Sequence, residues 1–283
     1  MSELIPVVDH AVINVDDHLD DAQALFVRMG FQLSARGHHS MGSSNHLAIF
    51  GENYLELLGY EPEIAGKTAA PKGLWQPPVG LVGLVWKTQD ADAIYQHLQK
   101  CQLDGEPPTA FFRPVTLPDG HVVEARFCIT RINSQRIPNG FSFFCQHLTP
   151  AAVWQPEWQQ HPNGVQDLSS FVIVADAPDS AAQVYSQLFG PEHAMQQNGE
   201  EYCLQAGKTT LRIITPAQLQ REGFALPDDY NGQPRMCALE FRVSSLAQTR
   251  ACLEKGDIRF STSNGTMIVS LSETLHVALR FHE

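Results

Sequence analysis

The sequence of 283 residues contains no window close to 18 consecutive apolar residues, so it predicts no membrane-spanning helix. The start, MSELIPVVDH, lacks the basic residues and the long apolar core of a secretory signal peptide. Basic residues are scarce, because 19 Lys and Arg stand against 31 Asp and Glu, and this argues against nucleic-acid binding. The six cysteines include no CxxC pair and are typical of reduced core residues. We therefore expect a cytoplasmic protein that binds neither membranes nor nucleic acids.

Signatures of several common enzyme classes are absent as well. The sequence has no GxSxG nucleophile motif, no phosphate-binding P-loop and no dinucleotide-binding glycine fingerprint. Hydrophobic residues make up 43% of the chain, which is enough for the core of one large or two medium domains.

One pattern occurs four times along the chain. An apolar strand ends at a residue able to cap a helix, an amphipathic helix follows, and short strands separated by Gly, Asn or Asp come next. In the first copy these are DHAVINV, HLDDAQALFVRM and then FQLSARG, HLAIFG and YLELLGY. The unit is therefore βαβββ, and it starts near residues 9, 81, 170 and 238. The predicted helix caps are Asp16 or Asp17, Thr88 or Asp90, Asp176 or Asp179, and Ser244 or Ser245.

Four such units predict an α+β protein with two domains. A four-stranded sheet with a helix on one face needs cover on the other face, and pairing two units side by side forms a curved sheet around a cavity. We expect residues 1–150 to hold the first pair and residues 168–283 the second pair. The stretch 151–167, which is rich in Pro and Trp and shows no strand alternation, is the expected connector.

Two charged side chains interrupt apolar strands of the first unit. His10 shares a strand face with Val12, whereas Ala11 falls on the opposite face. Glu56 lies between two leucines of YLELLGY, so alternation turns it toward the predicted cavity. A solvent-exposed His10 paired with Asp9, and an edge-strand Glu56, are the alternatives.

Four βαβββ units with a His in the first strand and a Glu in the fourth resemble the vicinal oxygen chelate superfamily. That superfamily includes glyoxalase I, extradiol dioxygenases, methylmalonyl-CoA epimerase and the bleomycin- and fosfomycin-resistance proteins. DHAVINV, YLELLGY, FSFFCQHLTP and WQPEWQQHPNG together are similar to bacterial glyoxalase-like proteins. The resemblance implies four βαβββ modules paired into two glyoxalase-like domains, of which the first binds metal and the second, residues 168–283, is degenerate.

The resemblance also implies which residues hold the metal, because such ligands come from the first and fourth strands of two paired modules. The matching residues of the first module are His10 and Glu56. In the second module His147 or Gln146 matches the ligand position of the fourth strand. The alternation of apolar residues along this strand does not decide between them. We favour His147, since imidazole is the better ligand. The first strand of that module offers only Gly83 or Leu84, so its ligand position is empty.

Two imidazoles and one carboxylate with open coordination positions suit one divalent ion of Fe, Mn, Zn, Ni or Co. Such an ion can hold two adjacent substrate oxygens, stabilise an enediolate or, as iron, activate O2. We therefore expect a metal-dependent enzyme, an isomerase, lyase or dioxygenase, that acts on a small molecule with vicinal oxygens. Glu56 is the candidate general base. A homodimer is compatible with this reading but not required.

The alternative is a protein that sequesters a small molecule without chemistry. Aromatic residues that could line its pocket are Tyr54, Trp75, Trp86, Phe143 and Phe144. The histidines of GHHSMGSSNH, His38, His39 and His46, are interpreted as a solvated turn.

Three arginines, Arg36, Arg113 and Arg126, could bind an acidic substrate group, and no spacing selects one of them. In the third and fourth modules Arg212, Arg280 and Glu240 stand at the ligand positions. The arginines would repel a cation, and Glu240 is expected to pair with one of them.

Overall fold

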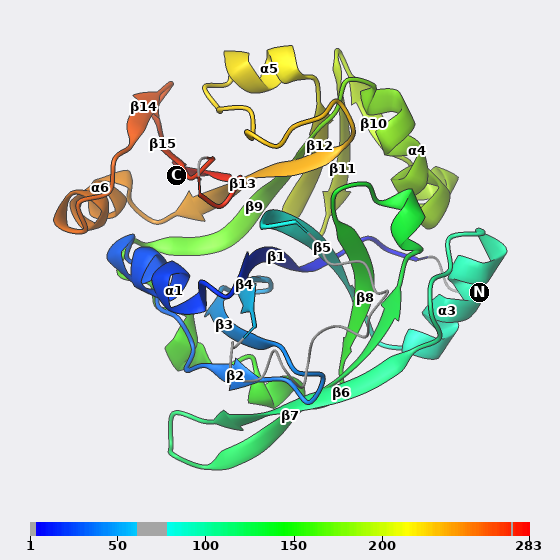
Figure 1. The fold of residues 1–283 in the computed structure, drawn as a ribbon, viewed down its shortest axis with the longest axis horizontal. Helices are drawn as coiled ribbons and strands as arrows, with labels where there is room; N and C mark the ends of the chain where they lie inside the picture. Colours follow the sequence, from blue (N-terminus) through cyan, green and yellow to red (C-terminus); the bar gives the residue numbers. More distant parts are fainter. Residues whose placement is uncertain (1–3, 61–77, 273) are drawn as a thin grey trace.

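The computed structural model describes residues 4–60, 78–272 and 274–283. Two eight-stranded mixed sheets with helices at their sides form the molecule (Figure 1). Each sheet is built from two βαβββ modules whose first strands lie next to each other at its centre. The predicted fold, an α+β protein of paired βαβββ modules, is confirmed.

The first sheet carries the strands of residues 8–147. Its order is β2-β3-β4-β1-β5-β8-β7-β6, with β1 and β4 parallel, β1 and β5 antiparallel, and β5 and β8 parallel. The strands are β1 (Val8–Asp16), β2 (Gly37–His38), β3 (Ser44–Ile49), β4 (Tyr54–Gly59), β5 (Gly80–Thr88), β6 (Thr109–Thr116), β7 (Val122–Arg131) and β8 (Phe141–His147).

The second sheet repeats this arrangement with residues 165–282. Its order is β10-β11-β12-β9-β13-β16-β15-β14. The first of these strands, β9, begins at Val165, inside the stretch predicted as a connector. The strands are β9 (Val165–Val174), β10 (Gln196–Asn198), β11 (Glu201–Ala206), β12 (Thr209–Ile214), β13 (Arg235–Val243), β14 (Ser261–Ser263), β15 (Thr266–Ser270) and β16 (Ala278–His282).

A helix follows the first strand of every module, and two of the four begin at a predicted cap. The helices are α1 (Leu19–Arg28), α3 (Ala91–Lys100), α4 (Pro178–Phe189) and α6 (Leu246–Lys255), with a short α5 (Pro216–Arg221) after β12. Asp90 and Ser245 accept hydrogen bonds from the first turns of α3 and α6. The other two predictions are wrong, because α1 and α4 begin after His18 and Ala177 without a side-chain cap. No helix among the described residues is long and apolar enough to cross a membrane.

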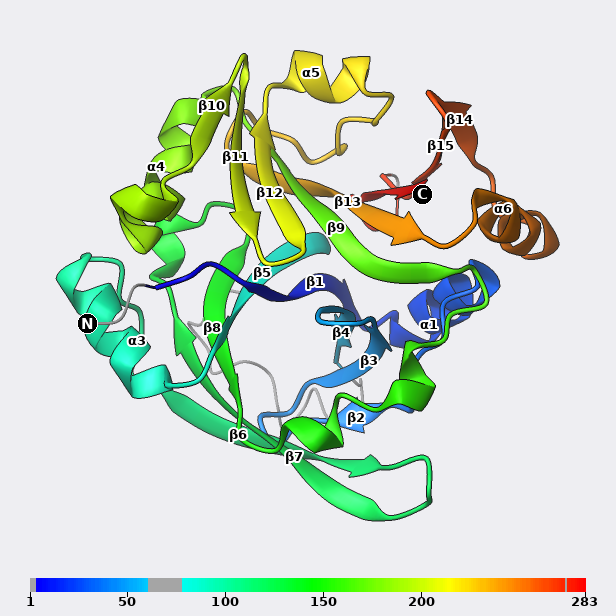
Figure 2. The ribbon, with the colours of Figure 1, turned by 180° about the vertical axis from the view of Figure 1, so that it is seen from behind.

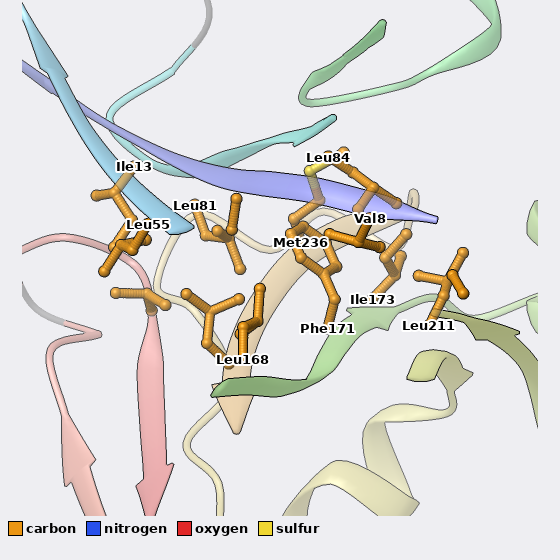
Figure 3. Close-up of a cluster of buried hydrophobic side chains, with 14 of the residues drawn as sticks. Val8, Ile13, Leu55, Leu81, Leu84, Leu168, Phe171, Ile173, Leu211 and Met236 are labelled. Carbon is orange, nitrogen blue, oxygen red and sulfur yellow. The ribbon is translucent and has the colours of Figure 1, made fainter. Parts of the chain in front are cut away.

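The two sheets pack against each other through their convex faces. Figure 3 shows the contact, in which Val8 and Leu84 of the first sheet lie beside Met236 of the second. These side chains belong to one continuous buried cluster and are at most 2% exposed. Burial of about 25 cal/mol per Å² of apolar surface makes this layer the main stabilising contact between the halves.

The first sheet curls until its two edge strands meet (Figure 2). Ser40, just after β2, donates its backbone N–H to the carbonyl oxygen of Phe112 in β6 at 2.9 Å. The Ser40 hydroxyl oxygen accepts from the Phe112 backbone N–H at 3.2 Å. The concave face of this sheet is therefore surrounded by its own strands, and the polar residues described below lie on it.

His161 fastens the segment between the sheets to the first module. Its Nδ1 accepts the Gln32 backbone N–H at 3.0 Å, and its Nε2 donates to the Ile49 carbonyl oxygen at 2.9 Å. Burial lowers the pKa of His161, so the folded protein favours the neutral ring that both hydrogen bonds require.

The unfolding midpoint is expected to fall when the pH is lowered from 7 to 5. The pKa of His161 is lower in the folded chain than in the unfolded chain, so its stabilisation is present above pH about 6.5 and is lost as the pH falls toward the folded pKa. His161→Gln should cost about 1–3 kcal/mol at pH 7, because the Gln32 N–H loses its acceptor, and should give a shallower pH dependence. Thermal unfolding at several pH values measures both effects.

The control is His121→Gln, since the His121 side chain is 81% exposed. This variant should keep the wild-type pH dependence. An equally steep dependence in His161→Gln would contradict the assignment.

Candidate functional site

A β-bulge places two neighbouring residues on the concave face of the first sheet. In the pairing of β1 with β5, Val8 lies opposite Trp86 and His10 opposite Val85, so Asp9 is an extra residue without a partner. The side chain of Val8 joins the convex core, whereas Asp9 and His10 both turn away from it. Asp9 is 0% exposed and His10 is 3% exposed. The alternative of a solvent-exposed His10 is therefore wrong.

His10 is held from two sides. Its Nδ1 donates to Oδ2 of Asp9 at 2.7 Å, and its ring stacks on Tyr54 with centroids 4.2 Å apart. With the proton on Nδ1, Nε2 carries a free lone pair, and this atom lies 3.6 Å from Oε2 of Glu56.

Glu56 reaches the same point from β4, as the alternation of its strand predicts. Leu55 and Leu57 are buried in the convex core, and Glu56 lies on the concave face two residues beyond Tyr54, the partner of His10. Its Oε1 accepts a hydrogen bond from Nδ2 of Asn45 at 2.6 Å, which fixes the carboxylate.

His147 also faces this site, whereas Gln146 does not. Gln146 turns to the convex side, where its Oε1 accepts the Ala91 backbone N–H at 3.0 Å and its Nε2 donates to the Gln89 carbonyl oxygen. Nε2 of His147 donates to Oδ2 of Asp9 at 3.0 Å. One carboxylate oxygen of Asp9 therefore binds both imidazoles.

The position that matches Glu56 in the second module is held by another residue. In the first module, His10 pairs with Tyr54, and Glu56 lies two residues after Tyr54. In the second module, Gly83 pairs with Phe141, and the residue two positions after Phe141 is Phe143. His147 lies four residues beyond Phe143, at the end of β8.

Gly83 has no room for a ligand side chain. A Cβ there would lie 2.6 Å from Cβ of Val12 and 2.6 Å from the Phe141 ring. The role of His147 as third ligand stays a prediction.

Asp9, Cys145 and His147 form a second group of potential ligands. Among the described residues they are the group of three whose ligand atoms all lie within 4.8 Å of one another. Oδ1 of Asp9 and Nδ1 of His147 are buried and have no hydrogen-bond partner. The nearest cation to Oδ1 of Asp9 in the described part of the structure is Lys87, whose Nζ lies 3.7 Å away, so this oxygen faces a positive charge without a hydrogen bond.

The surroundings of Asp9 and Cys145 shift the pKa of each side chain. Burial alone would raise the pKa of Asp9, but the charge of His147 and hydrogen bonds from both imidazoles hold it well below its usual value. Asp9 is therefore an anion at neutral pH. Burial raises the pKa of the Cys145 thiol well above its usual value, and the negative charges of Asp9 and Glu56 raise it further.

The turn of GHHSMGSSNH is not simply solvated, so that interpretation is wrong for two of its three histidines. The His39 side chain is only 9% exposed, and its Nε2 lies 3.1 Å from Nδ2 of Asn45 and 3.9 Å from Oε1 of Glu56. Burial lowers the pKa of His39 to about 4, against the attraction of Glu56, so the ring is neutral at pH 7. His46 is 2% exposed and its Nδ1 bonds to the Ser34 carbonyl oxygen.

Aromatic rings surround the polar side chains. Phe143 contacts His10 edge to face, Phe127 and Trp154 lie against His147, and Phe111 contacts His39. Phe144 and Trp86 belong instead to the convex core, and Trp75 lies outside the described residues. The sequence pattern did not single out Asn45, and it did not place Asp9 or Trp154 in the site.

The corresponding face of the second sheet holds a compact ion-pair network. Arg212 occupies the register position of Glu56, because it pairs with Val172 as Glu56 pairs with Val12. Oε1 of Glu240 accepts from Arg212 at 3.1 Å and from Arg280 at 3.0 Å. The predicted pairing of Glu240 with an arginine is confirmed for both.

Comparisons with known proteins give the same fold. The model of the glyoxalase-like domain family matches residues 8–189. A hypothetical protein from Staphylococcus aureus has a similar structure, with a TM-score of 0.66 and 14% identity over 98% of this chain and 99% of that chain. A variant of 4-hydroxymandelate synthase from Streptomyces coelicolor gives a TM-score of 0.57 and 13% identity over 98% and 92%. A xylose isomerase-like TIM barrel/4-hydroxyphenylpyruvate dioxygenase fusion protein gives 0.54 and 11% over 100% and 50%. No curated protein sequence matches the chain.

Proposed function

The chain belongs to the glyoxalase-like domain family, and we propose that it is a divalent-metal-dependent enzyme whose site is the concave face of the first sheet. Its substrate is a small molecule with two adjacent oxygens, and its chemistry is of the isomerase, lyase or dioxygenase type. At the sequence identities found, the solved structures support the fold and do not select among these reactions.

The observation that carries the proposal is the approach of His10 to Glu56. Nε2 of His10 and Oε2 of Glu56 are 3.6 Å apart, which is too far for a good hydrogen bond. Two ligand bonds of about 2.0–2.2 Å each can span this distance, so one divalent ion can contact both atoms. A histidine that donates its other nitrogen to a carboxylate is the usual outer contact of a metal-bound imidazole.

The residues present fit a divalent ion. His10 and Glu56 would hold it, and His147 is the third ligand that we propose. Asp9 and Cys145 offer further ligand atoms beside His147, and His39 offers one beside Glu56. Imidazole and carboxylate donors suit Fe, Mn, Zn, Ni or Co. When bound, the ion would act as a Lewis acid toward two adjacent substrate oxygens.

The chain's own residues then position and shield the reacting groups. Asp9 orients both imidazoles, Tyr54 supports the His10 ring, and Phe143 excludes water from its edge. Glu56, oriented by Asn45, is also the residue that we propose to accept a substrate proton.

Metal content tests the proposal directly. Protein purified without an affinity tag is expected to contain one equivalent of Fe, Mn, Zn, Ni or Co per chain by elemental analysis. Glu56→Gln and His10→Gln should each lower the retained metal at least tenfold, because each removes one ligand of the ion. His147→Gln and Cys145→Ser test the third donor in the same way.

Glu52→Gln is the matched control, since the Glu52 side chain is 60% exposed on the turn before β4. It should keep the wild-type metal content. No stoichiometric metal in the wild type, or full occupancy in Glu56→Gln, would refute the proposal.

The aromatic surroundings of the site favour a second candidate, a binding protein that sequesters a small aromatic molecule without chemistry. Tyr54, Phe143 and Trp154 would supply its apolar contacts. If the protein has this function, the affinity for an aromatic ligand should be the same in Glu56→Gln as in the wild type, and the purified protein should contain no bound metal.

A further inference from the structure

Arg113 is a buried arginine on the face of the sheet that carries the proposed site. It lies on β6, where residues 111, 113 and 115 turn inward and their neighbours are exposed. Phe111, two residues earlier on the same face, contacts the His39 ring. Arg113 is 3% exposed, so its charge is withdrawn from bulk solvent.

The guanidinium of Arg113 has no hydrogen-bond or ion-pair partner within the described part of the chain. The other fully buried arginine there, Arg235, bonds to three backbone carbonyl oxygens and to Asp229. Buried charges in proteins are almost always paired, because an unpaired charge is costly to remove from water. Arg113 therefore lacks the partner that its burial requires.

The described neighbours of Arg113 leave space for its side chain but form no hydrogen bond or ion pair with its guanidinium. A Cβ on Gly37 would lie 2.9 Å from Cδ and from Nη1 of Arg113, so only glycine admits the arginine there. Across the ladder its partner is Ala125, a small residue. The guanidinium acts electrostatically on Glu56, Tyr54 and His39 without an ion pair to any of them.

The charges of the site point to the sign of the missing group. Asp9 and Glu56 are balanced by Lys87, whose Nζ lies 3.7 Å from Asp9, and by Arg113. A divalent ion held there would leave an excess of two positive charges, which an anionic substrate offsets.

We propose that Arg113 binds the carboxylate of the substrate, so that the substrate carries an acidic group beside its two adjacent oxygens. This assignment rests on the proposed function for the place of the reacting oxygens. The planar fork of a guanidinium matches a carboxylate with two parallel hydrogen bonds. The other two candidates are engaged elsewhere: Arg36 bonds to Asp20, and Arg126 is 60% exposed and bonds to Glu124.

Two isosteric probe pairs test the assignment by isothermal titration calorimetry. The first pair is 3,4-dihydroxybenzoate and 3,4-dihydroxybenzamide, and the second, without vicinal oxygens, is benzoate and benzamide. The wild type is expected to bind each carboxylate at least tenfold more tightly than its amide. Arg113→Met should abolish this preference and leave the amide affinities within about twofold. Arg113→Lys should keep part of the preference, because it retains the charge and loses the fork.

Arg126→Met is the control and should behave as the wild type. A wild type without preference for carboxylates overturns the proposal, as does a preference that persists in Arg113→Met. Equal weakening of acid and amide in Arg113→Lys, whose unfolding midpoint is measured alongside, would assign Arg113 to the fold alone.

The outcome is separable from that of the metal experiment. The benzoate pair is also measured with chelator-treated protein and with Glu56→Gln. A preference that depends on Arg113 in metal-free protein upholds the anion site even if no metal function exists. Metal binding without that preference refutes the anion site alone.

Discussion

Asp9→Asn is expected to weaken metal binding about 10- to 100-fold although Asp9 is not among the proposed ligands. Oδ2 of Asp9 accepts from Nδ1 of His10 and from Nε2 of His147, so one carboxylate fixes the orientation and tautomer of both rings. The asparagine keeps the shape but removes the negative charge and adds donors that compete with the imidazoles. The dissociation constant for Zn²⁺ or Mn²⁺ in a chelator competition measures the loss.

Asp167→Asn provides the matched control, because Asp167 is also a buried carboxylate in the first strand of a sheet but bonds to Arg242 instead. Its metal affinity should equal that of the wild type. The double variant Asp9→Asn/His147→Gln should lose less metal-binding free energy than the sum of the two single variants, since both changes break the same hydrogen bond between Asp9 and His147. Additive losses, or an unchanged affinity in Asp9→Asn, would exclude an orienting role.

Local periodicity was sufficient to predict the fold and the direction of two site residues. The switch from strand to helix recurs in each module, and the alternation of Leu55, Glu56 and Leu57 predicts a carboxylate on the concave face, where the structure places it. His10 follows from the same rule, because Ala11 and Ile13 lie in the convex core. Such signals depend only on which face of one strand is buried.

The remaining site residues depend on contacts that a local pattern does not contain. The bulge at Asp9 breaks the alternation and has no sequence signature, so Asp9 could not be assigned to the face of His10. His39 looks like a turn residue, and its side chain is largely shielded from solvent because β6 closes over the turn after β2.

The second strand of the first module shows the same limit. FQLSARG was expected to form it, but β2 contains only Gly37 and His38. The backbone N–H groups of Gln32 and Ser34 bond instead to His161 and to the Leu47 carbonyl oxygen. His161, which accepts the Gln32 N–H in place of a strand neighbour, lies 129 residues away in the sequence.

Arg212→Met is expected to lower the free energy of unfolding by up to about 3–5 kcal/mol, because it removes the main counter-charge of three partly buried carboxylates. Arg212 donates to Glu201 at 2.7 Å, to Glu222 at 2.6 Å and to Glu240 at 3.1 Å, and each of these side chains is at most 21% exposed. Arg280 alone would remain to balance three glutamates. Urea unfolding at pH 7 measures the change.

Arg221→Met is the control, because Arg221 at the end of helix α5 pairs with Glu200 in solvent, and it should change the unfolding free energy by less than about 1 kcal/mol. Metal retention by the first sheet should be unaffected in both variants, because Arg212 lies on the other sheet at the register position of Glu56. If Arg212→Met unfolds like the control, the network is not structural. If it instead changes metal retention, the two concave faces are coupled. The equivalent positions of Glu56 and Arg212 would then not have separate roles, one in metal binding and one in stability.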